Sequence, residues 1–248
     1  MSTQVDNRTS KDPDFQSGFR LQFRWVTTVY AMGQIISKHP IVSRLMLATT
    51  NAGKIAEFRT LLGQWERWRG VELLTPGDWP TPLPSVDETG ETFAENARLK
   101  AVALAEATGL PALADDSGLC VDALGGEPGL HSARWAGETA TDADRNDLLL
   151  TRMVGMDTGR RTAHYVCVVS LAWPDGRSIE AEGACFGQIS ETPQGTNGFG
   201  YDPVFWVPEY GRTVAELTAD EKSKISHRAA ALRALEARLA ERDFEFAV

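Results

Sequence analysis

The sequence lacks several features that would mark particular classes of protein. No apolar run approaches the roughly 20 residues needed to span a membrane, and the N-terminus has no charged start followed by an apolar signal core. The formal net charge is −9, so the chain lacks the basic excess of a non-specific DNA- or RNA-binding protein. We therefore expect a protein with neither a membrane nor a nucleic acid as partner.

Cysteine is also scarce, and several familiar catalytic motifs are missing. The three cysteines, at positions 120, 167 and 185, are odd in number and far apart, which predicts reduced, buried thiols in a cytoplasmic protein. No HExxH, CxxC or Gly-x-Ser-x-Gly pattern occurs, so a zinc or serine hydrolase has no support. The aspartic-protease signature Asp-Ser/Thr-Gly occurs at 116–118 and 157–159, but the chain lacks the duplicated all-β pattern of that class.

The organisation of the chain favours one α/β domain. Residues 1–40 are polar or weakly patterned, and we interpret them as an extension outside the fold, of the kind that a misplaced start codon would add. The domain proper spans 44–248. Apolar runs and helical periodicities alternate within that domain, which predicts a mixed sheet. The expected strands are 44–49, 110–114, 163–173, 178–189 and 203–207, and the expected helices are 55–62, 93–108 and 220–242.

A polar turn follows the first expected strand and is a candidate phosphate site. Backbone N–H groups at a helix N-terminus bind anions, and Lys54 adds a full positive charge. It is not a P-loop, because Ala48 and Ile55 occupy positions where that motif needs glycine and Ser or Thr. The alternative is a plain strand-to-helix turn. The candidate residues are Thr49, Thr50, Asn51, Ala52, Gly53 and Lys54.

Two further segments carry concentrated charge. Asp115 and Asp116 follow an apolar run and are costly together unless a cation compensates them; Mg²⁺ prefers such carboxylate oxygens. The alternative is a solvated acidic turn. In the last expected helix, spacing places Lys224, His227 and Arg228 on one face. Cations near a helix N-terminus oppose its dipole unless an anion binds there, and the alternative is a solvated basic patch.

A glycine-rich loop with two aromatic rings occupies residues 195–203. Glycine lets the backbone approach a ligand closely, and an aromatic face suits a flat ligand. Together, the runs LATTNAGK (47–54), ETGETFAENA (88–97), ADDSGL (114–119), GFGYDP (198–203) and SHR (226–228) closely resemble the inosine/xanthosine triphosphate pyrophosphatase family over about residues 44–242.

The resemblance implies both a fold and a reaction. The fold would be an elongated mixed β-sheet flanked by helices, with two lobes, an active cleft between them and a homodimeric assembly. The reaction would be Mg²⁺-dependent hydrolysis of deaminated purine nucleoside triphosphates (ITP, dITP and XTP) to the monophosphate and pyrophosphate. Such an enzyme removes these nucleotides from the cytoplasmic pool.

The resemblance also implies roles for individual residues. The 49–54 turn would hold the triphosphate, although Thr50 stands where many relatives have glycine, as does Asn197. Asp116 would be the catalytic carboxylate, both metal ligand and acceptor of the proton from the attacking water, and either Asp87 or Glu88 would help to hold Mg²⁺. The remaining substrate contacts would come from Ser117, Phe199, Gly200, Tyr201, Asp202, Lys222, His227 and Arg228.

Two other functions stay open from the sequence. One is a pyrophosphatase of similar fold that acts on a different altered nucleotide, such as a modified pyrimidine. The other is a nucleotide-binding sensor without catalysis, against which the acidic residues Asp116, Asp87 and Glu88 argue because a sensor needs no metal site.

Overall fold

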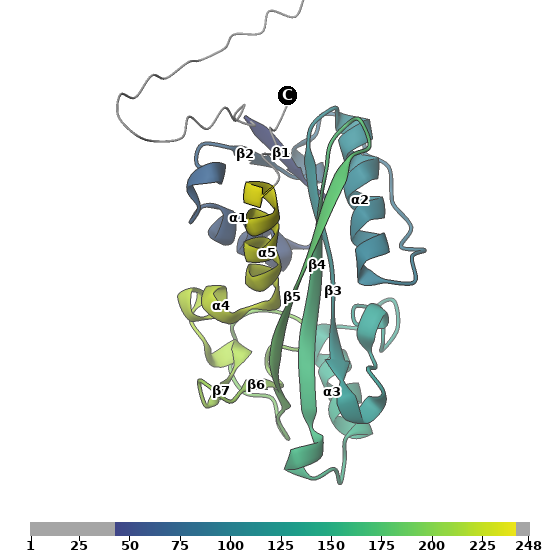
Figure 1. Ribbon diagram of the computed structural model, residues 1–248. Coiled ribbons are helices and arrows are strands. Elements are labelled where there is room, and N and C mark those ends of the chain that lie inside the picture. Colours follow the sequence, from purple (N-terminus) through teal and green to yellow (C-terminus); the bar gives the residue numbers. More distant parts are fainter. Residues whose placement is uncertain (1–42, 242–248) are drawn as a thin grey trace, which may run out of the picture. The chain divides into compact units, whose positions relative to one another are not determined.

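A seven-stranded mixed sheet organises the chain. The computed structural model describes residues 43–241, so the expected 1–40 extension lies outside the described residues. The strand order is β2-β1-β3-β4-β5-β6-β7 (Figure 1); β1 pairs in parallel with β2 and β3, and the other neighbours are antiparallel. The strands are β1 (Arg44–Leu47), β2 (Glu72–Leu74), β3 (Ala112–Val121), β4 (Thr162–Ala172), β5 (Ser178–Ile189), β6 (Phe205–Val207) and β7 (Arg212–Thr213).

Helices cover both faces of this sheet, which confirms the predicted α/β class. The helices are α1 (Ala52–Leu62), α2 (Phe93–Thr108), α3 (Asp142–Arg152), α4 (Ala219–Ile225) and α5 (His227–Glu241). Figure 1 shows α5 across β4 and β5 on one face, with α2 against the other face. No helix within residues 43–241 has the length and apolar character needed to cross a membrane.

The buried apolar side chains form clusters at the two ends of the long strands. At one end, Phe58 of α1 and Leu232 of α5 pack on one sheet face, and Ala101 of α2 packs on the other. At the other end, Leu149 of α3 packs with residues from the far ends of β3, β4 and β5. The region between these ends is where the candidate site lies.

Most of the predicted elements are confirmed, but β2, α3 and β7 were not predicted, and two predicted elements have the wrong extent. The predicted strand 110–114 is too short, because β3 pairs with β4 along its whole length, from Ala112 opposite Ala172 to Val121 opposite Ala163. The single predicted helix over 220–242 is two helices, because Ser226 is extended (φ −61°, ψ 147°). Ser226 Oγ accepts the N–H of Ala229 at 3.1 Å, so this residue starts α5 as an N-cap.

The break at Ser226 separates residues that the sequence predicted on one face. His227 and Arg228 are buried, whereas Lys224 belongs to α4 and is exposed. The prediction that Lys224, His227 and Arg228 share one cationic helix face is therefore wrong, because two helices with an extended residue between them do not share one helical period.

The short first strand leaves the middle of one edge of β3 open. β1 pairs with β3 only through Met46 and Leu47, opposite Ala112 and Leu113. The rest of β3, including Asp115 to Gly118, continues without β1 beside it. Side chains from both faces of β3 can therefore reach one space at this edge.

The close contact between α5 and β5 gives a test of the packing. A Cβ on Gly183 would stand 2.1 Å from the Ala231 backbone nitrogen, so Gly183→Ala must push α5 away from β5. We expect a loss of about 1–3 kcal/mol in the free energy of unfolding, as for other overpacked cores, measured by urea denaturation.

Gly159→Ala is the matched control for that substitution. A Cβ on Gly159 meets no atom within 4 Å and no positive φ opposes it. The control should change the free energy of unfolding by less than about 0.5 kcal/mol. Equal stabilities of the two variants would contradict the tight α5–β5 contact.

Candidate active site

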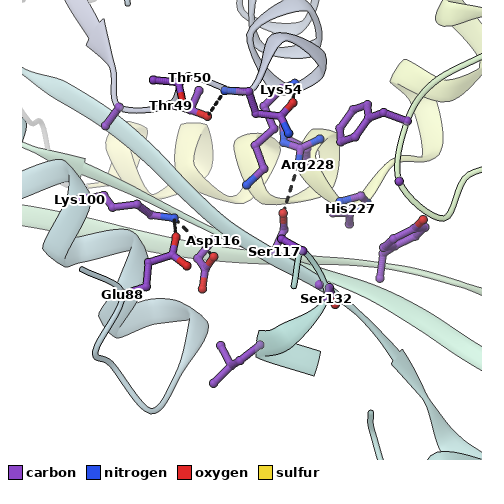
Figure 2. Close-up of a pocket in the computed structure, with 18 of the residues that line it drawn as sticks. Thr49, Thr50, Lys54, Glu88, Lys100, Asp116, Ser117, Ser132, His227 and Arg228 are labelled. Atoms are coloured by element: carbon purple, nitrogen blue, oxygen red, sulfur yellow. Dashed lines mark hydrogen bonds and ion pairs between the residues drawn. The ribbon is translucent and has the colours of Figure 1, made fainter. Parts of the chain in front are cut away.

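A cavity of about 580 Å³ gathers the predicted segments into one place. Its volume suits a small-molecule ligand, for which pockets of roughly 300–1,000 Å³ are usual. The lining comes from the 49–54 turn, the open edge of β3, the glycine-rich loop and the start of α5 (Figure 2). Of the predicted site residues, these line it: Thr49, Thr50, Asn51, Lys54, Glu88, Asp116, Ser117, Phe199, Gly200, Tyr201, Asp202, Lys222, His227 and Arg228.

The turn before α1 is held in shape by its own side chains. Asn51 is the N-cap of α1, and its Oδ1 accepts the N–H of Lys54 at 3.0 Å. Thr49 Oγ1 accepts the N–H of Asn51 at 3.2 Å. The start of α1 thus faces the cavity with its positive dipole end and the Lys54 side chain, an arrangement that suits an anion.

Ala52 and Gly53 do not line this cavity. Gly53 instead lies under the ring of Phe199, where an added Cβ would come within 2.4 Å of a ring carbon. Glycine at position 53 thus allows the aromatic loop to rest on the first turn of α1. Phe199 contacts the turn that the sequence predicts to hold phosphate.

Two carboxylates converge on one cation across the cavity. Lys100 Nζ lies 2.7 Å from Glu88 Oε1 and 3.4 Å from Asp116 Oδ1 (Figure 2). Asn96 Nδ2 donates to Asp116 Oδ2 at 3.2 Å. Of the pair that the sequence left open, Glu88 lines the cavity and Asp87 does not. The alternative of a solvated acidic turn is wrong, because Asp115 and Asp116 are buried within β3.

The pKa values of Asp116 and Glu88 are shifted in opposite directions. Burial raises the pKa of Asp116 above its usual value, although Lys100 opposes the change. Burial also acts to raise the pKa of Glu88, but the hydrogen bond and charge of Lys100 outweigh it and lower that pKa. Asp116 is therefore the better proton acceptor of the two.

Asp115 points to the opposite face of β3 and pairs with two cations. Its Oδ2 lies 2.9 Å from Lys54 Nζ and 3.1 Å from Arg228 Nη2. Burial acts to raise the pKa of Asp115, but Lys54 and Arg228 outweigh it and hold the pKa well below its usual range. Ser117 donates to the same carboxylate at 3.1 Å.

A second ion-pair cluster supports the aromatic loop. Lys222 Nζ lies 2.6 Å from Asp202 Oδ2 and 2.5 Å from Glu57 Oε1, and 4.8 Å from the centre of the Phe199 ring. Asp202 Oδ2 also accepts the N–H of Phe199 at 3.0 Å. Asp202 therefore fixes the loop from within, and the cation over Phe199 adds an electrostatic attraction.

His227 and Tyr201 are held in place by contacts with Tyr165 and Ser132. The His227 ring stacks on Tyr165 with centroids 4.6 Å apart and an angle of 15°. Burial and the nearby Arg228 hold the pKa of His227 well below its usual value, so its imidazole is neutral. Tyr201 donates its hydroxyl to the carbonyl of Ser132 at 3.0 Å.

Comparisons with known proteins identify the family of this chain. The model of the Ham1 family matches residues 45–238. The chain belongs to the Ham1 family. It is 52% identical over 194 residues to the dITP/XTP pyrophosphatase of Streptomyces avermitilis, an alignment that covers 78% of this chain and 96% of that protein. It is 49% identical over 195 residues to the dITP/XTP pyrophosphatase of Geobacillus kaustophilus, covering 79% and 93% respectively.

Solved structures of Ham1 proteins share the fold. The Staphylococcus aureus Ham1 protein matches with a TM-score of 0.68 and 39% identity, over 80% of this chain and 98% of that one. A Ham1 protein from Coxiella burnetii matches with a TM-score of 0.69 and 42% identity, over the same shares of the two chains. The family resemblance predicted from the sequence motifs is therefore confirmed.

Sequence reasoning missed several residues of this Ham1 site. Lys100 stands one helical turn after Asn96 on α2, so the i, i+4 spacing was a usable signal. Glu57 stands three residues after Lys54 on α1 and could have been linked with it in the same way. Asn146 and Asp142 gave no signal; they bind the carbonyl and the N–H of Gly200 at 3.1 and 2.6 Å across a long sequence separation.

The donor set at Glu88 and Asp116 is compatible with Mg²⁺. Within residues 43–241, no group of three or more His, Cys, Asp or Glu side chains surrounds one metal position. Mg²⁺ in nucleotide enzymes uses one or two carboxylates together with substrate phosphates and waters. Two carboxylates that already converge on the Lys100 ammonium meet this requirement.

The Lys222 cluster can be tested by removing its cation. Lys222→Met leaves the buried Asp202 carboxylate without its ammonium partner. We expect a loss of about 3 kcal/mol in the free energy of unfolding, the usual scale for breaking one side of a buried pair, measured by urea denaturation. Lys224→Met is the matched control on the same helix, since Lys224 is exposed. A control variant as unstable as Lys222→Met would contradict the role of the buried pair.

Proposed function

We propose that this chain hydrolyses deaminated purine nucleoside triphosphates (ITP, dITP and XTP) to the monophosphate and pyrophosphate. The observation that carries the proposal is that one cavity contains a cationic turn, a buried carboxylate cluster and an aromatic loop. These features suit the phosphates, the reacting centre and the base of a nucleotide, respectively. The names of the relatives, dITP/XTP pyrophosphatases, support the same substrates.

The phosphates would enter beside Lys54 and the 49–54 turn. A triphosphate carries about four negative charges near neutral pH, and attack by an anionic nucleophile is repelled unless this charge is neutralised. Lys54 and the N-terminus of α1 face the cavity and supply positive potential there. Glu88 and Asp116 would hold Mg²⁺, which when bound neutralises further phosphate charge and makes a water molecule more acidic.

Asp116 would accept the proton of the attacking water. The water oxygen forms a bond to the α phosphorus, the bond from that phosphorus to the bridging oxygen breaks, and pyrophosphate leaves. Burial raises the pKa of Asp116, which makes the carboxylate a stronger base, and Asn96 and Lys100 fix its orientation. Asp116 then holds the proton until it is returned to solvent.

Base selection would depend on the C6 position of the purine. Hypoxanthine and xanthine carry a carbonyl at C6 and a protonated N1, whereas adenine carries an amino group and a bare N1. Lys222 and Arg228 bring donors to the cavity beside Phe199, so a carbonyl would be paired and an amino group would not. Each unpaired buried group costs roughly 1–3 kcal/mol. A mismatch at C6 and a second at N1, where a protein acceptor would pair the N1 proton of hypoxanthine but not the bare N1 of adenine, would give about two to four decades of discrimination.

A substrate panel tests the proposed reaction. The protein is incubated with ITP, XTP, GTP, ATP and dTTP in the presence of Mg²⁺, and pyrophosphate release is measured. We expect ITP and XTP to be cleaved at least about 100-fold faster than ATP, in kcat/KM. Preference for dTTP would favour the alternative pyrophosphatase that acts on a pyrimidine nucleotide, and no release from any triphosphate would favour a sensor.

Asp116→Asn tests the catalytic carboxylate in the same assay. The variant keeps the shape of the side chain but loses the basic oxygen, so we expect kcat for ITP to fall by about 100-fold or more. Circular dichroism should show an unchanged fold. Near-normal turnover by Asp116→Asn would refute the assignment.

Removal and titration of Mg²⁺ test the metal assignment. EDTA should abolish turnover, and Mg²⁺ should restore it. Glu88→Gln should raise the Mg²⁺ concentration for half-maximal activity by about tenfold, because one of two carboxylate ligands is lost. Asp87→Asn is the matched control and should shift it less than about twofold, since Asp87 does not line the cavity. The opposite pattern would assign the ligand to Asp87.

The resemblance also supports a cytoplasmic homodimer. The reduced state of Cys120, Cys167 and Cys185 is consistent with that compartment. Sedimentation velocity of the full chain and fractionation of cells would test the assembly and its location.

A further inference from the structure

A buried carboxylate that does not line the cavity lies directly behind three residues that do. The Asp115 side chain has no exposed surface, and its Oδ2 contacts Lys54, Arg228 and Ser117. Those three side chains line the cavity, whereas Asp115 does not. Whatever Asp115 does for a ligand must therefore act through its neighbours.

The two cations depend on Asp115 to different extents. Arg228 is also paired with Glu57, so two carboxylates hold its guanidinium. Lys54 has Asp115 as its one ion-pair partner within residues 43–241, at 2.9 Å. A lysine side chain has several rotatable bonds and a point charge, so it takes a fixed position only when a partner holds it. Asp115 is that partner for Lys54.

The second oxygen of Asp115 is also informative. Asp115 Oδ1 is buried and has no hydrogen-bond partner among the described residues. An unpartnered buried oxygen on a charged group is costly. A sheet position that served packing alone would be filled at lower cost by an apolar residue, as other positions of β3 are.

We propose that Asp115 is a positioning residue, which holds the Lys54 ammonium against the triphosphate in the transition state without touching the substrate. The inference rests on the proposed function. Lys54 has three N–H donors, so it can donate to Asp115 and still reach a phosphate oxygen. Holding the ammonium in place before the reaction removes the cost of ordering it when the negative charge develops.

The inference predicts a separation of kcat from KM. Asp115→Asn removes a negative charge near the phosphates, so ground-state binding should not weaken, and KM for ITP should stay equal or fall. The released Lys54 should lower kcat by about 10- to 100-fold, the scale of a misplaced catalytic group. A general loss of structure would instead weaken both binding and turnover. Asp122→Asn, a surface variant with the same charge change, should alter kcat and KM less than about twofold.

A double-mutant cycle decides whether Asp115 acts through Lys54. Lys54→Met alone should raise KM and lower kcat. In the Lys54→Met background, Asp115→Asn should lower kcat by less than about threefold further, because coupled residues are non-additive. An equal loss of kcat in both backgrounds would overturn the inference, and so would a raised KM with an intact kcat.

Measuring the binding of inorganic tripolyphosphate tests the inference independently of the proposed function. Calorimetry on the same four proteins needs no turnover. Asp115→Asn should raise the affinity when Lys54 is present and should change it by less than about twofold in the Lys54→Met background. If the wild type cleaves no triphosphate, the proposed function fails while this binding cycle still judges the coupling. Asp115→Ser serves as a second variant if Asp115→Asn does not fold, and failure of both to fold would show a structural role and overturn the inference.

Discussion

The early end of β1 is the constraint on which the arrangement of this site depends. β1 ends at Leu47 and pairs with β3 through only two residues, while β3 continues along β4 to Val121. A strand normally separates its two faces, since successive side chains point in opposite directions. At an uncovered edge both sets reach the same space. Asp116 from one face and Ser117 from the other can therefore line one cavity.

Buried charges connect the parts of this cavity. Lys54, Arg228 and Lys222 are each paired with at least one of the carboxylates of Asp115, Glu57 and Asp202. Burying such pairs removes the hydration of both ions, and their mutual electrostatic attraction offsets this cost only when the geometry is good. These buried pairs make the site rigid, because each ion has a fixed partner before any ligand binds. A site organised in this way needs little reorganisation to stabilise the charge of a reacting phosphate.

Elements whose signals lie within one short segment were predicted from the sequence, whereas features that depend on residues distant in the sequence were not. The hairpin strand β5 and the helix α2 were predicted closely, because apolar periodicity, the turn at 174–176 and the cap at Thr92 are local signals. The extent of β3 was underestimated, since two adjacent aspartates oppose a buried strand unless distant cations compensate them. Lys54 and Arg228 supply that compensation from other elements.

The sequence by itself determined the α/β class, the family and most residues of the site, because these follow from periodicity and from motifs within short segments. Only the tertiary structure decided which carboxylate of the pair at 87–88 faces the cavity, that Lys100 joins Glu88 to Asp116, and that Asp115 lies behind the site rather than in it. These facts depend on which elements meet at the open edge of β3. Such meetings are set by packing and by charge pairs between residues up to 171 positions apart, which no local pattern encodes.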